Sequence, residues 1–263
     1  MLISYIAMKG KRTVKDLIKN NFKYLIFLAF FGLVGGYFTA IYSIQSFDPK
    51  MLEEVIAQVG SLDLLVVITT LQSLGYALVL GIIGKYLAKK IGLWRKVTFT
   101  KNGNIEFIIV TLVGGAAFIL FDHLIFNNFS DVIKDSYALK PTFEYIMASI
   151  TYGSVIEEVM LRLFLMSFIA WSIQKISKKE EANDTIIIVS NIVAALIFAA
   201  GHLPATYAMM TDITPMIIFR CFLLNGGFGL LFGRLYRKYG IHYAMLAHGG
   251  VHIVSKLIWI LFI

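Results

Sequence analysis

Three charged side chains stand close together in an otherwise apolar segment near the middle of the chain. Residues 153–164 read GSVIEEVMLRLF and include Glu157, Glu158 and Arg162. On a helix, Glu158 and Arg162 are four residues apart on one face and can pair, whereas Glu157 points about 100° away from them. An unpaired carboxylate in apolar surroundings is a candidate general base.

Three histidines provide the partners that such a base needs. His202 follows Phe198 by four residues in FAAGH, and His248 and His252 have the same spacing in HGGVH. A carboxylate and an imidazole can share a water molecule and remove its proton, so that the water attacks a carbonyl carbon. Two donors on another helix would stabilise the resulting oxyanion.

Other hydrolytic chemistries have weaker support in the sequence. Ser154 and Cys221 are not followed or preceded by a base in a recognisable nucleophile motif, and the chain contains no HExxH sequence. A glutamate and two histidines can still bind a catalytic zinc ion, which commonly has three protein ligands and one open position. A metal-free and a zinc-dependent hydrolase therefore both remain open.

The elements that must position these residues are membrane-spanning helices. Hydrophobic residues make up 58% of the chain, and its mean hydropathy is +0.77, whereas a soluble domain has roughly 45–50% apolar residues. About seven segments reach the roughly 20 apolar residues that cross a bilayer. These segments are Tyr24–Ile44, Asp63–Ile83, Ile105–Phe126, Phe143–Ser172, Thr185–His202, Pro215–Leu235 and Ile241–Ile263. We expect an all-α, polytopic transmembrane helical bundle in a lipid bilayer.

The basic residues predict how this bundle is oriented. They gather in residues 9–23, 85–101, 175–179 and 234–238, which fall on one side of the predicted membrane. By the positive-inside rule that side, including the N-terminus, is cytoplasmic. This distribution also accounts for the net charge of +8 without a nucleic-acid partner. Residues Lys9–Asn21 are expected to form an interfacial amphipathic helix.

Some polar residues lie toward the ends of predicted spans, where water is near. We interpret Asp122 and His123 as interface residues for this reason. Arg220 and Lys256 have long side chains that can extend to the interface while their apolar stems stay in lipid. None of these four is predicted to belong to the site.

The three motifs carry a resemblance to a known family. Residues 157–162 (EEVMLR) match the pattern EExxxR, residues 198–202 (FAAGH) match FxxxH, and residues 248–252 (HGGVH) take the place of HxxxN. In this order they resemble the CPBP family of intramembrane proteases, which includes type II CAAX prenyl endopeptidases and bacterial proteins linked to bacteriocin processing or self-immunity. The resemblance covers about residues 143–263 as the catalytic core. Residues 1–142 would be additional N-terminal spans of one integral membrane domain over residues 1–263.

The resemblance implies an intramembrane endopeptidase in a bacterial plasma membrane, acting on a membrane-associated or lipophilic peptide or protein. It implies that Glu157 is the general base, that His202 is its partner on the water, and that His248 and His252 bind the oxyanion. Supporting roles in the geometry fall to Glu158, Arg162 and Phe198.

One position departs from the family pattern. His252 stands where the prenyl endopeptidases commonly have asparagine, so its hydrogen-bond donation depends on pH and it also suits metal binding. The glutamate mechanism requires no cofactor, whereas a zinc-dependent enzyme would use Glu157, His202 and His248 as ligands. The departure weakens the expectation of a prenylated substrate.

Two other functions could use the same polar cluster. A non-catalytic bacteriocin-immunity or peptide-binding membrane protein would hold a peptide there without cleaving it. A transporter or proton relay also places glutamate and histidine inside a membrane, although the chain shows no inverted repeat. The sequence specifies neither the physiological substrate nor the oligomeric state.

The predicted depths of the candidate residues do not agree. At 1.5 Å per residue from the cytoplasmic helix ends, Glu157 and His202 lie about 22 and 25 Å deep, whereas His248 and His252 lie about 10 and 16 Å deep. A single site therefore requires that the helices be tilted or displaced relative to one another.

Overall fold

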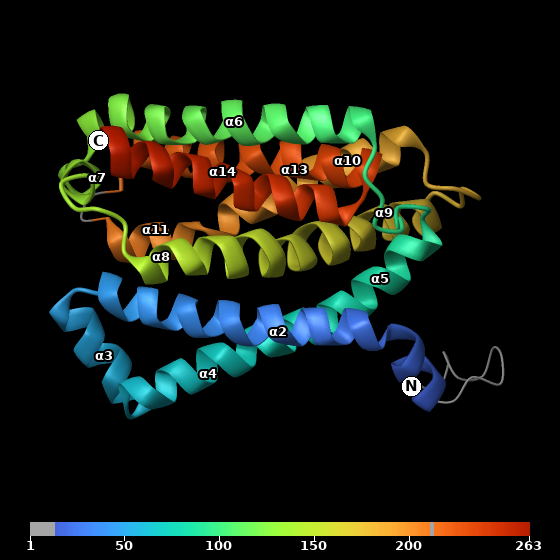
Figure 1. Ribbon diagram of the computed structural model, residues 1–263, viewed down its shortest axis with the longest axis horizontal. Coiled ribbons are helices and arrows are strands. Elements are labelled where there is room, and N and C mark those ends of the chain that lie inside the picture. The colour runs from blue at the N-terminus through green and yellow to red at the C-terminus, as the bar shows by residue number, and fades with distance from the viewer. Residues whose placement is uncertain (1–13, 211–212) are drawn as a thin grey trace.

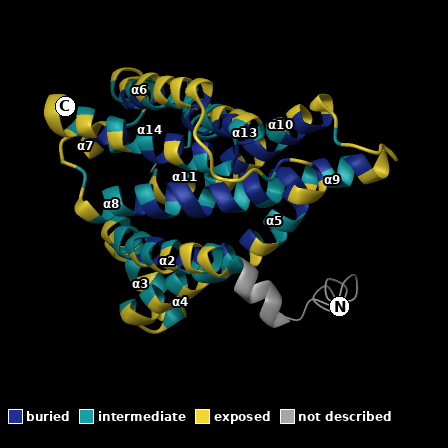
Figure 2. Cartoon of the chain, turned by 45° about the vertical axis from the view of Figure 1, so that its right-hand side comes forward, coloured by how far each residue is buried: buried dark blue, intermediate teal, exposed yellow. Residues whose placement is uncertain are grey.

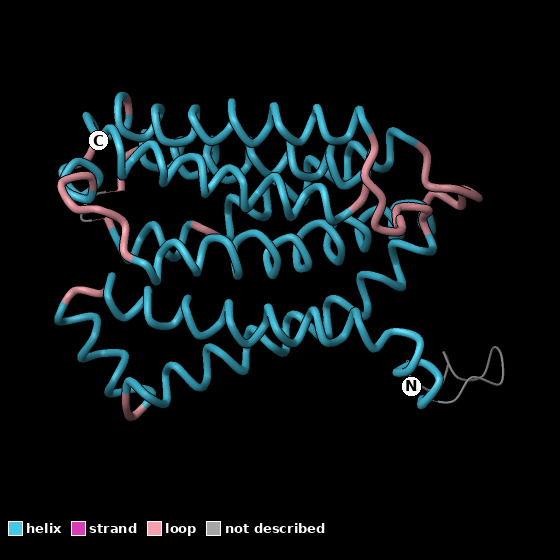
Figure 3. Tube along the Cα trace, viewed as in Figure 1, coloured by secondary structure: helices cyan, strands magenta, loops and turns pink. Residues whose placement is uncertain are grey.

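The described part of the protein is built from helices. The computed structural model describes residues 14–210 and 213–263, which form helices joined by loops at the two ends of the bundle, with no strand among them (Figure 3). The all-α fold class is confirmed. The first five residues of the expected interfacial helix Lys9–Asn21 lie outside the described residues, and the other eight are the start of α2, which begins at Val14 and continues into the first span.

The helices of the first half form a long hairpin followed by one return span. Their bounds are α2 Val14–Ser46, α3 Pro49–Val59, α4 Leu62–Gly75, η1 Tyr76–Leu80, α5 Gly81–Lys90, α6 Lys101–Leu124, η2 Phe126–Phe129 and α7 Asp131–Ser136.

The helices of the second half contain all the candidate site residues. Their bounds are α8 Phe143–Ala148, η3 Ser149–Glu157, η4 Val159–Met166, α9 Ser167–Ile176, α10 Asp184–Gly201, α11 Leu203–Met209, α12 Pro215–Cys221, η5 Phe222–Gly227, α13 Phe228–Tyr239 and α14 Ile241–Phe262.

Six helices of the described residues are long and apolar enough to cross a membrane. They correspond to the predicted spans except Phe143–Ser172, which is helical but carries Glu157, Glu158 and Arg162. The second and fifth spans both extend beyond their predicted ends, from Ile83 to Lys90 and from His202 to Met209. The prediction of about seven spans is therefore close to the observed architecture.

Side-chain caps define where several of these helices begin. Thr142, Asn183 and Thr214 each accept a hydrogen bond from the backbone N–H three residues later, at 3.1–3.3 Å, which satisfies one of the unpaired donors at a helix start. Pro215 at the start of α12 fits there because the first turn needs no N–H donor. Gly240 has φ +108° and forms the tight turn between α13 and α14.

Helices α8, η3, η4 and α9 follow one another without a loop, and we call residues 143–176 the central rod. The rod lies between the hairpin of α2, α4 and α5 on one side and the group of α6, α10, α13 and α14 on the other (Figure 1). Its η3 part contacts both α2 and α14, and its η4 part contacts both α5 and α10. The rod carries the densest run of buried residues in Figure 2. The charged segment is thus surrounded by protein.

The central rod is wound as a π-helix over most of its middle. Hydroxyls in η3 donate to carbonyl oxygens four residues earlier, from Ser149 to Tyr145 at 2.7 Å and from Ser154 to Ile150 at 2.6 Å. These bonds compete with the α-helical N–H donors for the same carbonyls, which favours bending and wider turns. Glu157 lies at the end of η3, just where the wide turns continue into η4.

Candidate active site

The two adjacent glutamates of the central rod have different surroundings. Glu158 is fully buried and Arg162 is 2% exposed, and their side chains form an ion pair with Oε1 and Nη1 3.3 Å apart. The Arg162 guanidinium also lies over the Phe198 ring, 4.8 Å from its centroid. Phe198 thus contacts the guanidinium as a cation–π partner. The i, i+4 pairing that the sequence predicts is observed.

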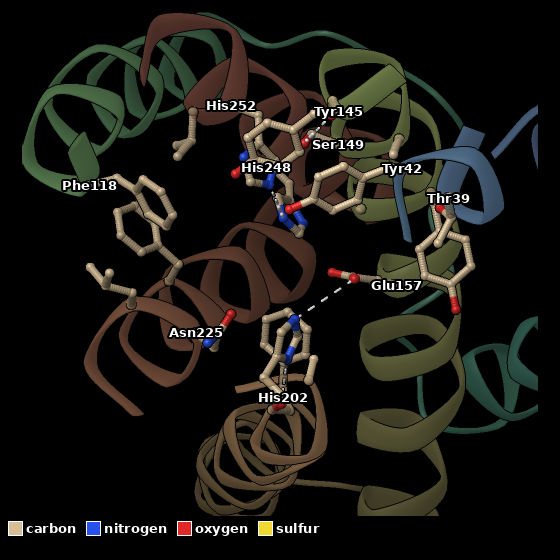
Figure 4. A pocket seen from close by; sticks show the side chains of 18 of the residues that line it. Thr39, Tyr42, Phe118, Tyr145, Ser149, Glu157, His202, Asn225, His248 and His252 are labelled. Atoms are coloured by element: carbon tan, nitrogen blue, oxygen red, sulfur yellow. Dashed lines mark hydrogen bonds and ion pairs between the residues drawn. The ribbon is translucent and has the colours of Figure 1, made fainter. Parts of the chain in front are cut away.

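Glu157 faces a cavity and approaches His202 across it. The side chain of Glu157 is 19% exposed, and its Oε1 lies 4.0 Å from His202 Nε2 (Figure 4). His202 is fixed from the other side, because its Nδ1 lies 2.9 Å from the Phe198 carbonyl oxygen. A carbonyl only accepts, so Nδ1 carries the hydrogen, and in the neutral ring Nε2 presents a lone pair to the cavity.

The separation of Glu157 and His202 suits a bridging water molecule. A gap of 4.0 Å is too long for a direct hydrogen bond. A water oxygen can sit about 2.8 Å from both atoms at once and hydrogen-bond to each. The phenyl ring of Phe198 packs edge-on against the imidazole, with ring centroids 4.6 Å apart, so the His202 ring has little freedom to turn away.

A second chain of contacts joins Glu158 to the two histidines of α14. His248 Nδ1 lies 2.9 Å from Glu158 Oε1, and His248 Nε2 lies 3.2 Å from His252 Nε2. Because an ionised carboxylate only accepts, His248 donates from Nδ1 to Glu158. The His248 ring also stacks on Phe232 with centroids 4.5 Å apart. Glu158 is thus the anchor of His248 as well as the partner of Arg162, which the sequence did not indicate.

These two arrangements meet at one cavity of about 380 Å³. Glu157, His202, His248 and His252 all line it, so the structure brings together the four residues that the sequence assigns to catalysis. Their catalytic roles remain a prediction. If the helices were straight and began at the same depth, these four residues would lie at different depths in the membrane. The way the helices pack around the central rod brings them to one cavity.

Several polar residues that also line the cavity were missed by sequence reasoning. Among them are Thr39 and Tyr42 from α2, Tyr145 from α8 and Asn225 from η5 (Figure 4). The sequence could have indicated Asn225, because a single amide in an apolar span is unusual. It gave no such indication for the two tyrosines, since tyrosine near a span end is usual at a membrane interface.

A second cavity of about 510 Å³ continues from the first, sharing Tyr42, Tyr145, His202 and Asn225 with it. It reaches Asp122, Arg220 and Lys256, which the sequence placed at the interface. Asp122 and Lys256 are 5% and 4% exposed, so their assignment to the interface was wrong, whereas Arg220 keeps 21% of its side chain exposed.

Asp122 is buried, and its carboxylate is bound by both Arg220 and Tyr137. Arg220 forms a two-point contact through Nε and Nη2, with Nη2 2.7 Å from Asp122 Oδ2, and the Tyr137 hydroxyl donates to Oδ2 at 2.8 Å. Such a fork contact matches guanidinium and carboxylate geometry and holds Arg220 inside the protein.

The fit to a metal ion is poor in the part of the chain described. No group of three or more histidine, cysteine, aspartate and glutamate side chains there could hold a metal ion. The proposed zinc ligands Glu157, His202 and His248 do not all face one point. His248 donates from Nδ1 to Glu158, and its Nε2 contacts His252. Zinc dependence remains an untested prediction, and we derive no step through a metal.

Comparison with known proteins agrees with the motifs. Residues 140–254 match the family described as type II CAAX prenyl endopeptidase Rce1-like. No match was found to a curated protein or to a solved structure. The matched stretch contains all three motifs, and the resemblance to the CPBP family is confirmed for this part of the chain. The match indicates a membrane protease of the CAAX endopeptidase type.

Proposed function

Taking the match to the CAAX endopeptidases as a premise, we propose that this chain cleaves a peptide bond of a membrane-associated or lipophilic peptide with water activated by Glu157 and His202. The observation that carries the proposal is the pair of facing atoms, Glu157 Oε1 and His202 Nε2, 4.0 Å apart at a cavity wall. A water held between them loses a proton to Glu157 as its oxygen attacks the carbonyl carbon.

His252, positioned by His248, supplies the stabilisation of charge. His248 and His252 bring their Nε2 atoms to within 3.2 Å of each other at the cavity. With His248 Nε2 as acceptor, His252 donates its N–H to it, and a substrate carbonyl oxygen can take that N–H as negative charge develops. Glu157 then passes its proton to the departing amine, so the peptide bond breaks and the base is restored.

Gly153 leaves the space for that oxygen. A Cβ on this residue would lie 3.6 Å from His252 Nε2 and 3.9 Å from His248 Nε2. The backbone of the central rod therefore runs directly beside the proposed oxyanion position, with no side chain in the way.

The test is cleavage of a membrane-peptide library by purified parent and Glu157→Gln protein. The variant is expected to lose a factor of about 10²–10⁴ in kcat, which is the usual contribution of a general base. Its melting temperature in detergent should stay near that of the parent, because His202 Nε2 lies beyond hydrogen-bond distance of Glu157 and the His202 ring keeps its contact with the Phe198 carbonyl. Glu181→Gln, in an exposed loop, is the matched control and should cleave like the parent.

Turnover retained by Glu157→Gln would rule out the proposed base. Peptide binding without turnover in the parent would instead favour the immunity or peptide-binding function. Elemental analysis of active protein, with chelation and re-addition of zinc, tests the metal-dependent mechanism separately.

The proposed orientation places the entrance to the site on the outer face of the membrane. The second cavity is lined by Ser136, the last residue of α7, and by Leu139 and Lys140, which follow it. These residues lie at the bundle end opposite the basic clusters that end α5, α9 and α13 (Figure 1). Basic clusters mark the cytoplasmic side. The substrate would then enter from outside the cell.

Cysteine labelling tests this orientation. The single native cysteine, Cys221, is buried, so an introduced cysteine dominates labelling by a membrane-impermeant maleimide. Ala138→Cys should react in intact cells, whereas Lys178→Cys should react only after permeabilisation. The reverse pattern would invert the proposed topology.

A further inference from the structure

Lys256 has a buried amino group that faces the second cavity. It is 4% exposed, and its Nζ lies 4.0 Å from the centroid of the Tyr145 ring. Among the described residues, the amino group of Lys256 contacts this ring and forms neither an ion pair nor a hydrogen bond. An ammonium group taken from water without an anion is unfavourable, so a partner for it would be strongly bound.

The other charges of the cavity do not provide that partner. The nearest carboxylate on the cavity wall, Asp122, is held by Arg220 and Tyr137 through both of its oxygens. Asp122 and Arg220 cancel in charge, which leaves the positive charge of Lys256. The rim residue Lys140 adds a further positive charge and no negative one.

The position of Lys256 connects it to the proposed chemistry. On α14 it follows His252 by four residues, a rise of about 6 Å. An extended peptide covers that length with about two residues. The two cavities share His202, Asn225 and Tyr145, so one chain can pass from the first into the second.

From this placement we infer that Lys256 binds a carboxylate of the peptide substrate, two to three residues beyond the bond that is cleaved. The C-terminal carboxylate of a peptide meets this requirement if cleavage occurs near that end. An ammonium group carries one positive charge and three donors, which suits a single carboxylate. The inference rests on the proposed endopeptidase function and adds a residue that selects the substrate.

The test compares matched peptides that end in a carboxylate or in a carboxamide. The parent should prefer the acid by about 10- to 100-fold in kcat/KM, mainly through KM, as a charge-assisted hydrogen bond predicts. In Lys256→Met the acid-to-amide ratio should fall to about one, with the amide cleaved at nearly the parental rate. Lys256→Arg should retain a preference for the acid.

Two controls separate this role from a structural one. Lys140→Met removes an exposed lysine at the rim of the same cavity and should leave the ratio unchanged. A third peptide, amidated at its end but carrying aspartate two residues after the cleaved bond, distinguishes a side-chain carboxylate from the terminal one. Preference for either acid supports a carboxylate site and identifies its source.

The inference can fail independently of the proposed function. If the parent cleaves acid and amide equally, or if Lys256→Met keeps the preference, the carboxylate site is wrong although the protease is not. If nothing is cleaved, the same ratio is measured as peptide affinity by fluorescence anisotropy. Equal affinity, or no binding of either peptide, also overturns the inference.

Discussion

Glu157 and Glu158 are neighbours in the chain, yet they occupy opposite kinds of environment. Glu158 touches Arg162 and His248 and is fully buried. Glu157 lines the cavity, and its Oε1 lies 4.0 Å from His202 Nε2. On one face of the central rod the charged groups pair with each other, although Glu158 Oε2 and both Arg162 Nη atoms lack a hydrogen-bond partner among the described residues. On the adjacent face Glu157 and His202 leave room for a third molecule. A turn of about 100° around the helix separates a structural charge from one available for chemistry.

The largest effect on stability is expected from breaking the buried ion pair of Glu158 and Arg162. Arg162→Ala leaves Glu158 buried with only His248 as a partner, and removing one member of a buried ion pair costs about 3–5 kcal/mol. Thermal melting in detergent measures it, and cleavage should decline with the folded fraction. If Arg162→Ala melted like the parent, the structural role of the pair would be wrong.

Replacing both members of the pair sharpens the contrast. Glu158→Leu combined with Arg162→Met substitutes apolar groups of similar size, which is often neutral for stability in a buried site. Melting should then recover relative to Arg162→Ala. Activity should not recover, because His248 has lost its acceptor, and misplacement of a catalytic group by about 1 Å can cost about 10²-fold. Full activity in the double variant would show that Glu158 does not position His248.

A smaller effect is expected from filling the open face. Gly153→Ala adds a methyl group in ordinary contact distance of both Nε2 atoms, so the fold should tolerate it. In a helix alanine is favoured over glycine by up to about 1 kcal/mol. We expect unchanged or higher melting and roughly tenfold lower kcat/KM, a loss of about 1.4 kcal/mol in transition-state binding. Gly75→Ala, where nothing lies within 4 Å, is the control.

The smallest effect concerns Tyr137, at the far end of the second cavity. Burial, and after it the Asp122 carboxylate, raise the pKa of the Tyr137 hydroxyl above its ordinary value of 10.0. Its hydrogen bond therefore stabilises the fold fully below about pH 10, and this contribution is lost as the pH rises through the raised value. Tyr137→Phe should cost about 1 kcal/mol at neutral pH. Melting measured from pH 7 to 11 should fall less steeply for the variant than for the parent.

Local patterns predicted much of the fold and part of the site. Hydropathy located the spans because a bilayer fixes the length of an apolar helix. The four-residue spacing of Glu158 and Arg162 predicted their ion pair, since neighbours on one helix face are set by the sequence alone. The turn that separates Glu157 from them followed from the same geometry.

Contacts between distant helices could not be predicted in this way. The bond from His248 to Glu158 depends on how α14 is displaced along the central rod, which no spacing within either helix encodes. Lys256 was assigned to the interface because of its place near a span end, whereas the packing of α14 against α8 encloses it. Asp122 was also assigned wrongly to the interface, because its partner Arg220 is 98 residues away in the chain and no local pattern links the two.

The π-helical turns of the central rod limit which mutations the protein can tolerate. Loss of one codon between Ser149 and Gly153 would remove one residue from these wide turns. The segments on either side would then shift relative to each other by roughly one helical residue, which in an α-helix is about 100° and 1.5 Å. With Glu158 and Arg162 tied to their neighbours, the misfit would fall on the stretch next to Glu157. We therefore expect active variants of the protein to carry amino-acid substitutions between Ser149 and Gly153. We expect none of them to carry an insertion or a deletion there.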